Sequence, residues 1–116
     1  MIDIYDNLLE PHIAELIDMK MHQQTWRYNY HSQNGTPNKH WHVFCGHDPE
    51  EVTKNEYDWL MPIWDTAFAK YDFKKKYNVV EFKRLYLNAH THGIEPHMHM
   101  DDGDFTMMYY PILDWK

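Results

Sequence analysis

With 116 residues, of which 43% are hydrophobic and 16% aromatic, the chain has the length and apolar content of one globular domain. Its formal net charge of −7 and its scattered basic residues disfavour nucleic acid or an anionic membrane surface as a partner. The single cysteine, Cys45, excludes an intrachain disulfide framework, and no apolar run reaches the roughly 18 residues of a membrane-spanning helix. Together with the lack of a signal-peptide pattern, these features predict a cytoplasmic protein.

The first elements are a short strand and a helix. Residues 1–5 alternate between apolar and polar, which predicts a strand, and residues 7–23 carry an apolar stripe at helical spacing. Asp6 or Asn7 is the predicted helix cap, and Pro11 falls in the first turn.

Two more strands and a second helix follow. Residues 25–31 and 40–44 alternate and predict strands, with a loop over residues 32–38 between them. Aromatic and apolar side chains at helical spacing predict a helix within residues 53–71, and Pro62 either kinks this helix or marks its first turn.

The remainder of the chain is strand-rich. Residues 78–88 predict a long strand, and residues 95–100 and 105–110 predict two more, joined by an acidic turn. A helix-rich part over 1–77 followed by strands over 78–116 predicts one domain of the α+β class.

The pair His99 and Asp101 is the most informative motif. On a strand, residues two apart point to the same face, so this imidazole and this carboxylate would converge on one point. One histidine and one carboxylate are two of the three ligands in the facial triad that holds non-haem Fe(II) in oxygenases. A structural hydrogen bond between the two side chains is the alternative.

Polar residues recur in phase on the neighbouring strands. Such a row needs partners or a ligand, because an unsatisfied buried polar group costs about 1–3 kcal/mol. The pattern fits the mouth of a small β-barrel. The residues predicted to face inward are Arg84, Tyr86 and Asn88 on one strand and Asp104, Thr106, Met108 and Tyr110 on the other.

In their order along the chain, these motifs resemble the Fe(II)/2-oxoglutarate dioxygenases of the prolyl-4-hydroxylase type, and most of all their short viral and bacterial forms. The resemblance is sharpest over residues 82–111. The residues that carry it are Arg84-x-Tyr86-x-Asn88, Gly93, His99-x-Asp101, Asp104-x-Thr106 and Tyr110.

The resemblance implies N-terminal helices packed on a partial double-stranded β-helix, or jelly roll. It implies that His99 and Asp101 bind Fe(II), that Tyr110 binds a carboxylate of the co-substrate 2-oxoglutarate, and that Tyr86 and Asn88 line the same pocket. Ascorbate is a further candidate cofactor. The implied reaction hydroxylates a C–H bond of a small-molecule or peptidyl substrate while 2-oxoglutarate is converted to succinate.

The chain departs from the family's pattern after His99. No histidine follows, whereas the family supplies a distal His as third ligand and then an Arg or Lys for the far carboxylate of 2-oxoglutarate. We therefore expect residues 1–116 to be the N-terminal part of a longer oxygenase domain, inactive alone and able to self-associate through an open sheet edge.

Alternative interpretations stay open. The chain could be a non-catalytic, cupin-like or degenerate jelly-roll module that binds a metal or a partner. His97 could be a third ligand, a pocket-lining residue or a packing residue. We expect His90 and His92 at the pocket rim, His40 and His42 as ordinary strand residues, and Cys45 as a buried small hydrophobe. Thr106 and Met108 are candidate pocket residues.

Overall fold

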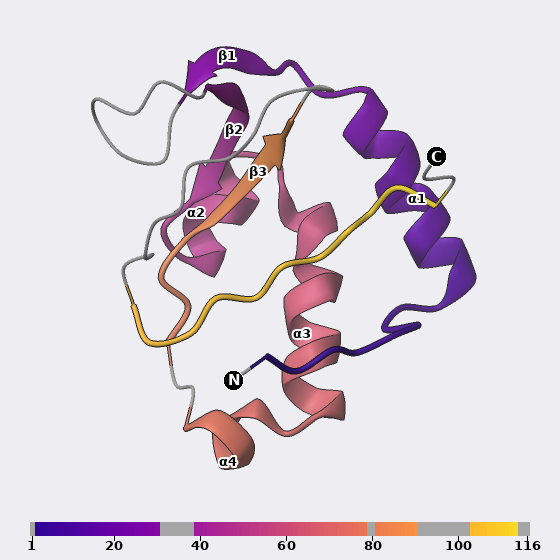
Figure 1. Cartoon of the computed structure of the whole chain (residues 1–116), viewed down its shortest axis with the longest axis vertical. Helices are drawn as coiled ribbons and strands as arrows, with labels where there is room; N and C mark the ends of the chain where they lie inside the picture. The colour runs from indigo at the N-terminus through magenta and orange to yellow at the C-terminus, as the bar shows by residue number, and fades with distance from the viewer. Residues whose placement is uncertain (1, 31–38, 79–80, 91–102, 114–116) are drawn as a thin grey trace.

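A computed structural model of the chain describes residues 2–30, 39–78, 81–90 and 103–113 (Figure 1). Helices combine with a small antiparallel sheet, so the predicted α+β class is confirmed. No helix in these ranges is long and apolar enough to cross a membrane. In chain order the elements are α1 (Pro11–His22), β1 (Arg27–Tyr30), β2 (His40–Gly46), α2 (Pro49–Lys54), the 3-10 turn η1 (Asp58–Leu60), α3 (Met61–Lys70), α4 (Phe73–Tyr77) and β3 (Leu85–Ala89).

The sheet has the order β1-β2-β3, and both pairs of neighbours are antiparallel. The predicted strand at 40–44 is confirmed and continues to Gly46, and β1 is a shorter form of the strand predicted at 25–31. The long strand predicted at 78–88 is wrong in extent, because β3 begins only at Leu85, where pairing with β2 begins.

The hydrophobic core joins one face of the sheet to the helices. Its larger cluster takes buried residues from α1, β2, α2, η1 and β3, and a smaller cluster lies around Phe73. Burial of these side chains is the main term that stabilises the fold. The buried members are Ile17, Met21, Val43, Cys45, Val52, Leu60 and Leu87 in the first cluster and Leu8, Ala67 and Phe73 in the second.

Helix α1 begins later than predicted. Its N-cap residue is Glu10, and Pro11 occupies the first helical turn, where its missing N–H costs no hydrogen bond. The predicted cap at Asp6 or Asn7 is wrong, since Asn7 adopts a left-handed backbone conformation with φ 55° and lies before the helix.

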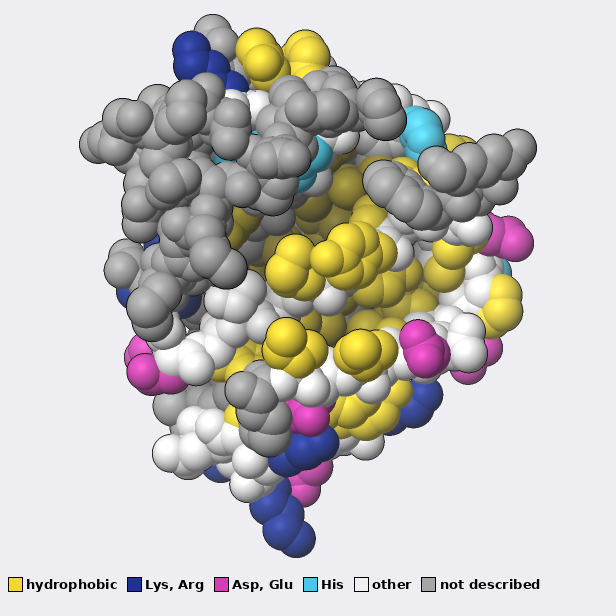
Figure 2. Space-filling model, viewed as in Figure 1, with side chains coloured by type: hydrophobic (Ala, Val, Ile, Leu, Met, Phe, Trp, Pro, Cys, Tyr) yellow, Lys and Arg dark blue, Asp and Glu magenta, His cyan; other side chains and the backbone are white. Residues whose placement is uncertain are grey.

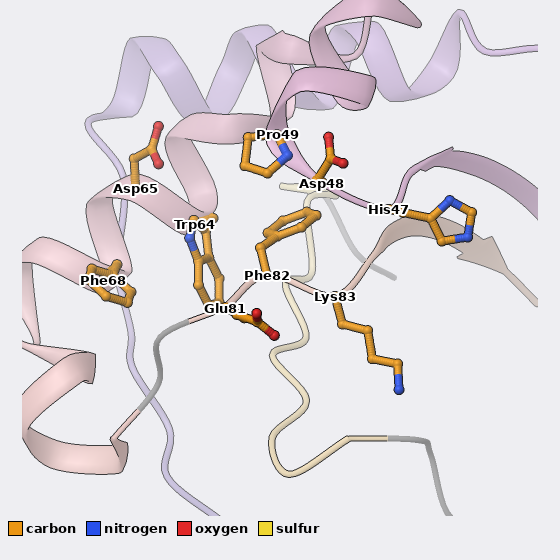
Figure 3. A pocket seen from close by; sticks show the side chains of 9 residues that line it. All are labelled: His47, Asp48, Pro49, Trp64, Asp65, Phe68, Glu81, Phe82 and Lys83. Carbon is orange, nitrogen blue, oxygen red and sulfur yellow. The ribbon is translucent and has the colours of Figure 1, made fainter.

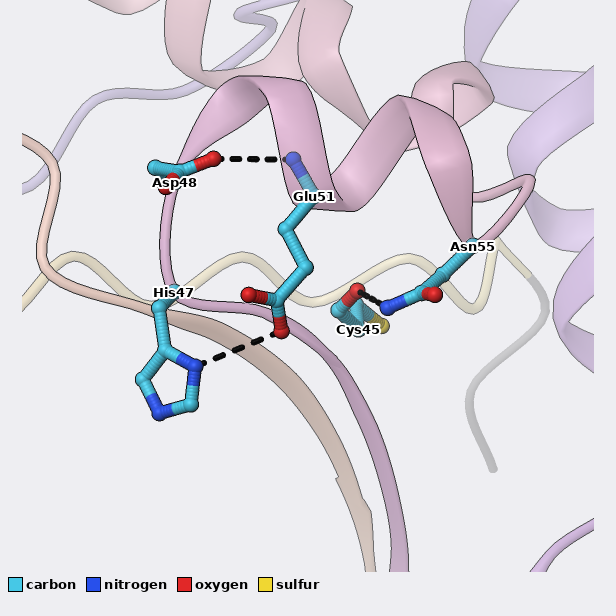
Figure 4. A network of polar contacts seen from close by, with 5 residues as sticks. All are labelled: Cys45, His47, Asp48, Glu51 and Asn55. Atoms are coloured by element: carbon cyan, nitrogen blue, oxygen red, sulfur yellow. Dashed lines mark hydrogen bonds and ion pairs between the residues drawn. The ribbon is translucent and has the colours of Figure 1, made fainter.

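The helix predicted within residues 53–71 is confirmed as α3, and the turn η1 and the separate helix α2 precede it. Pro62 lies in the first turn of α3, so it begins a helix and does not kink one. Asp48 caps α2, because its side chain accepts a hydrogen bond of 2.8 Å from the backbone N–H of Glu51 (Figure 4).

The junction between β2 and α2 is tight. The Asn55 side-chain amide donates a hydrogen bond of 2.9 Å to the carbonyl oxygen of Cys45, and His47 Nδ1 lies 3.3 Å from Glu51 Oε1 (Figure 4). At Gly46 an added Cβ would lie 2.7 Å from the backbone nitrogen of Val52. Glycine therefore allows the end of β2 to approach the backbone of α2.

Two predicted strands are absent from the described structure. Residues 2–5 form no strand but pack through Tyr5, whose ring stacks 4.1 Å from that of Tyr71 and whose hydroxyl contacts Tyr77. Residues 105–110 also form no strand; the segment 103–113 crosses α3 toward α1 (Figure 1). Strand formation requires a ladder partner, and within the described residues these two segments are outside the sheet. The strand predicted at 95–100 and the loop at 32–38 lie outside the described residues.

Candidate functional site

The face of the sheet opposite the hydrophobic core carries imidazole, amide and aromatic side chains. Antiparallel pairing places His42 opposite Asn88 and Phe44 opposite Tyr86, while Val43 opposite Leu87 faces the core. Because alternate residues of a strand share a face, Tyr86 and Asn88 lie on the same side, as the sequence predicts. We call this face, formed by His40, His42, Phe44, Tyr86 and Asn88, the polar face of the sheet.

The centre of the polar face is a hydrogen bond between His42 and Asn88. His42 Nδ1 lies 2.8 Å from Asn88 Oδ1. An amide oxygen only accepts, so His42 donates from Nδ1 and this bond fixes its neutral tautomer. Burial lowers the pKa of His42, and the hydrogen bond to Asn88 offsets part of that effect. His42 is therefore a neutral imidazole at physiological pH.

Two further imidazoles lie beside His42. The His40 ring is 3% exposed, stacks on the His90 ring at 4.7 Å and lies 6.3 Å from the His42 ring. The sequence prediction treated His40 and His42 as ordinary strand residues and missed this cluster. The H-x-H alternation was its only signal, because the register that brings His90 beside His40 depends on long-range pairing.

The Tyr86 ring lies close to both the His42 imidazole and the Arg84 guanidinium. Its ring lies 5.3 Å from the His42 ring, and Arg84 Cζ lies 5.8 Å from the centroid of the Tyr86 ring. A guanidinium over an aromatic face is a favourable contact. Arg84 thus brings positive charge to the polar face, just before the first residue of β3.

The predicted iron ligands His99 and Asp101, together with His97, His92 and Gly93, lie outside the described residues. Within the described ranges, no three His, Cys, Asp or Glu side chains come close enough together to hold a metal ion.

The predicted inward orientation of Tyr110 is wrong in this structure. Tyr110 is 79% exposed and Met108 is 70% exposed, and Thr106 is exposed as well. Their neighbours Met107 and Tyr109 pack against the hydrophobic clusters instead, so the alternation is displaced by one residue. Figure 2 shows hydrophobic side chains gathered on this side of the molecule. The 2-oxoglutarate role of Tyr110 and the pocket roles of Thr106 and Met108 stay predictions.

Cys45 is not a nucleophile of this site. It is fully buried in the core, on the other side of β2 from His42, and its thiol lies 3.8 Å from the carbonyl oxygen of Val43. Burial raises the pKa of the thiol to about 12, so the thiolate is negligible at neutral pH. The predicted role of Cys45 as a buried small hydrophobe is confirmed.

In comparisons with known proteins, no protein-family model, no curated protein and no solved structure matches this chain.

Proposed function

We propose that the chain belongs to an Fe(II)- and 2-oxoglutarate-dependent oxygenase that hydroxylates a C–H bond. The observation that supports this most is the polar face of the sheet. In a small antiparallel sheet, one face ordinarily packs on the core and the other face is exposed to solvent. Here that other face holds a buried His40, a neutral His42 hydrogen-bonded to Asn88, and Tyr86. A few imidazole, amide and phenol groups on one face are the kind of polar groups that orient a ligand in a pocket.

The fold that accompanies this proposal is a partial double-stranded β-helix. Strands β2 and β3 would form one wall of its barrel, with the polar face toward the lumen. The helices α1, α2 and α3, which pack on the opposite face with Val43 and Leu87, would then lie outside the barrel.

Iron would be held by His99 and Asp101, whose imidazole nitrogen and carboxylate oxygen are the donor types that Fe(II) oxygenases use. Bound Fe(II) would supply the activation of O2 that hydroxylation needs. The polar face would bind and orient 2-oxoglutarate. Arg84 would contribute positive charge, and the Tyr86 hydroxyl would donate a hydrogen bond to a carboxylate. The hydrogen bond between His42 and Asn88 would fix the orientation of these two side chains on β2 and β3.

The first experiment measures metal binding. Mn(II), which replaces Fe(II) without oxidising, is titrated into the chain and followed by calorimetry. We expect His99→Ala to weaken binding by about tenfold or more, the scale reported for changes around a metal site. His12→Ala, an exposed histidine of α1, is the matched control and should leave binding unchanged. Equal affinity of the His99 variant and the parent would reject the metal assignment.

The second experiment separates the oxygenase from a non-catalytic metal-binding module. Succinate production is measured with the longest form of the protein that its gene encodes, because the family's reaction also needs a distal His and a basic residue. Turnover of 2-oxoglutarate that is lost in His99→Ala supports the oxygenase. Metal binding through His99 without succinate, in a protein that has the distal His, supports the cupin-like module.

A further inference from the structure

A second candidate site lies away from the polar face of the sheet. A groove of about 760 Å³ opens between the start of α2, helix α3 and residues 81–83 (Figure 3). Its volume is within the usual range for small-ligand sites. The apolar side chains that line it are Pro49, Trp64, Phe68 and Phe82.

The aromatic rings form adjoining walls in this groove. The rings of Trp64 and Phe82 lie 5.7 Å apart at 86°, and the Phe68 ring lies 5.6 Å from Trp64 on the other side. All three side chains are half-buried, so each is fixed by packing and still presents part of its ring to the groove. Aromatic faces attract cations, and a tryptophan face does so most strongly.

The charges along the groove favour a cation as well. Three carboxylates, those of Asp48, Asp65 and Glu81, line it together with only one ammonium group, that of Lys83. Asp48 is already engaged as the cap of α2. Within the described parts of the chain, Asp65 and Glu81 take part in no hydrogen bond or ion pair. Glu81 lines the same groove as Trp64 and Phe82, and in Figure 3 the Lys83 side chain extends away from these rings.

We propose that this groove binds the side chain of a lysine or arginine that belongs to another polypeptide. The apolar stem of such a side chain would pack on the rings of Trp64, Phe68 and Phe82, and its charged head would meet the Glu81 carboxylate. A free amino acid fits less well, because its own α-carboxylate would face the acidic rim. This inference stands apart from the oxygenase proposal, since no candidate ligand of iron or 2-oxoglutarate lines the groove.

The test uses four short capped peptides on the 116-residue chain: Gly-Lys-Gly, Gly-Arg-Gly, and their neutral counterparts with norleucine and citrulline. Binding is followed by the NMR shift of the Trp64 indole N–H, assigned through Trp64→Phe. We expect the two basic peptides to bind and the neutral ones to bind at least about fivefold more weakly. Free arginine should bind more weakly than the capped arginine peptide.

Variants at the rim complete the test. Glu81→Gln should weaken binding of the lysine peptide by about three- to tenfold, the scale of one carboxylate facing a partly exposed cation. Glu15→Gln removes the same charge from the exposed side of α1 and should leave binding unchanged. Glu81 is exposed and, among the described residues, takes part in no hydrogen bond or ion pair, so we expect the variant to fold like the parent. Equal binding of the neutral peptides, equal loss in both variants, no binding of the basic peptides, or tighter binding of free arginine would overturn the proposal.

Discussion

The close approach of β2 to α2 at Gly46 makes a quantitative prediction about stability. In Gly46→Ala the new Cβ would lie 2.7 Å from Val52 N and 2.9 Å from Val52 Cγ2, inside the 3.0 Å that Cβ atoms essentially never cross. Overpacking costs about 1–3 kcal/mol, and the upper part of this range applies because one of the contacts is backbone. Alanine recovers about 0.5–1 kcal/mol through the lower entropy of its unfolded state. The expected net loss is about 2 kcal/mol.

That loss converts into a melting temperature. An unfolding entropy of about 2.1 cal/mol/K per residue gives about 0.24 kcal/mol/K for this chain, so Gly46→Ala should melt about 8 °C below the parent. The assay is thermal unfolding followed by circular dichroism at fixed protein concentration. Glu15→Ala, at an exposed position of α1, is the control and should melt within about 2 °C of the parent. A Gly46→Ala protein that melts at or above the parent temperature would refute the close β2–α2 packing.

Three further predictions follow from single residues. Burial lowers the pKa of His42 below its value in the unfolded chain, so the unfolded state binds more protons as the pH falls. The contribution of His42 to the free energy of unfolding is therefore full above about pH 6.5 and decreases at lower pH. In thermal melts, the melting temperature of His42→Gln should fall less steeply with decreasing pH than that of the parent. The Cys45 thiol, with a pKa of about 12, should not react with a disulfide reagent at about pH 8 until the chain unfolds, and rapid labelling of the native protein would contradict its burial. In chemical denaturation, Met107→Ala should lower the free energy of unfolding by about 1–2 kcal/mol and Met108→Ala by less than about 0.5 kcal/mol. A larger loss in Met108→Ala would show that Met108 faces inward, as the sequence predicts.

Hydrophobic periodicity in the sequence predicted the helices and strands that depend on nearby residues. The apolar stripe of α1, the alternation of β2 and the place of Tyr86 and Asn88 on one face of β3 all follow from periods of 3.6 or 2 residues. Pro62 shows where such patterns stop being decisive. Proline is compatible with a first turn or a kink, and only the packing around η1 and α3 selects the first turn.

Long-range contacts account for the failures. Residues 107–110 are apolar on both phases, but Asp104 and Thr106 alternate with Phe105, which favours burial of the phase that holds Met107 and Tyr109. The opposite phase was predicted to face inward because its polar residues fitted a ligand pocket. Met107 and Tyr109 are half-buried because they pack against the cluster of Leu8, Ala67 and Phe73, which are far away in the chain. The histidine cluster was missed for the same reason, since His40 and His90 meet only through the register of β2 and β3.

The central claim is that the polar face of the sheet forms the wall of a metal site built on His99 and Asp101. The most direct measurement is the paramagnetic broadening of NMR signals by Mn(II). The account predicts that Mn(II) broadens the side-chain signals of Asn88 and His42 before those of α1, and that His99→Ala abolishes this pattern. The claim would be contradicted if Mn(II) left the signals of Asn88 and His42 unbroadened, or if their broadening persisted unchanged in His99→Ala.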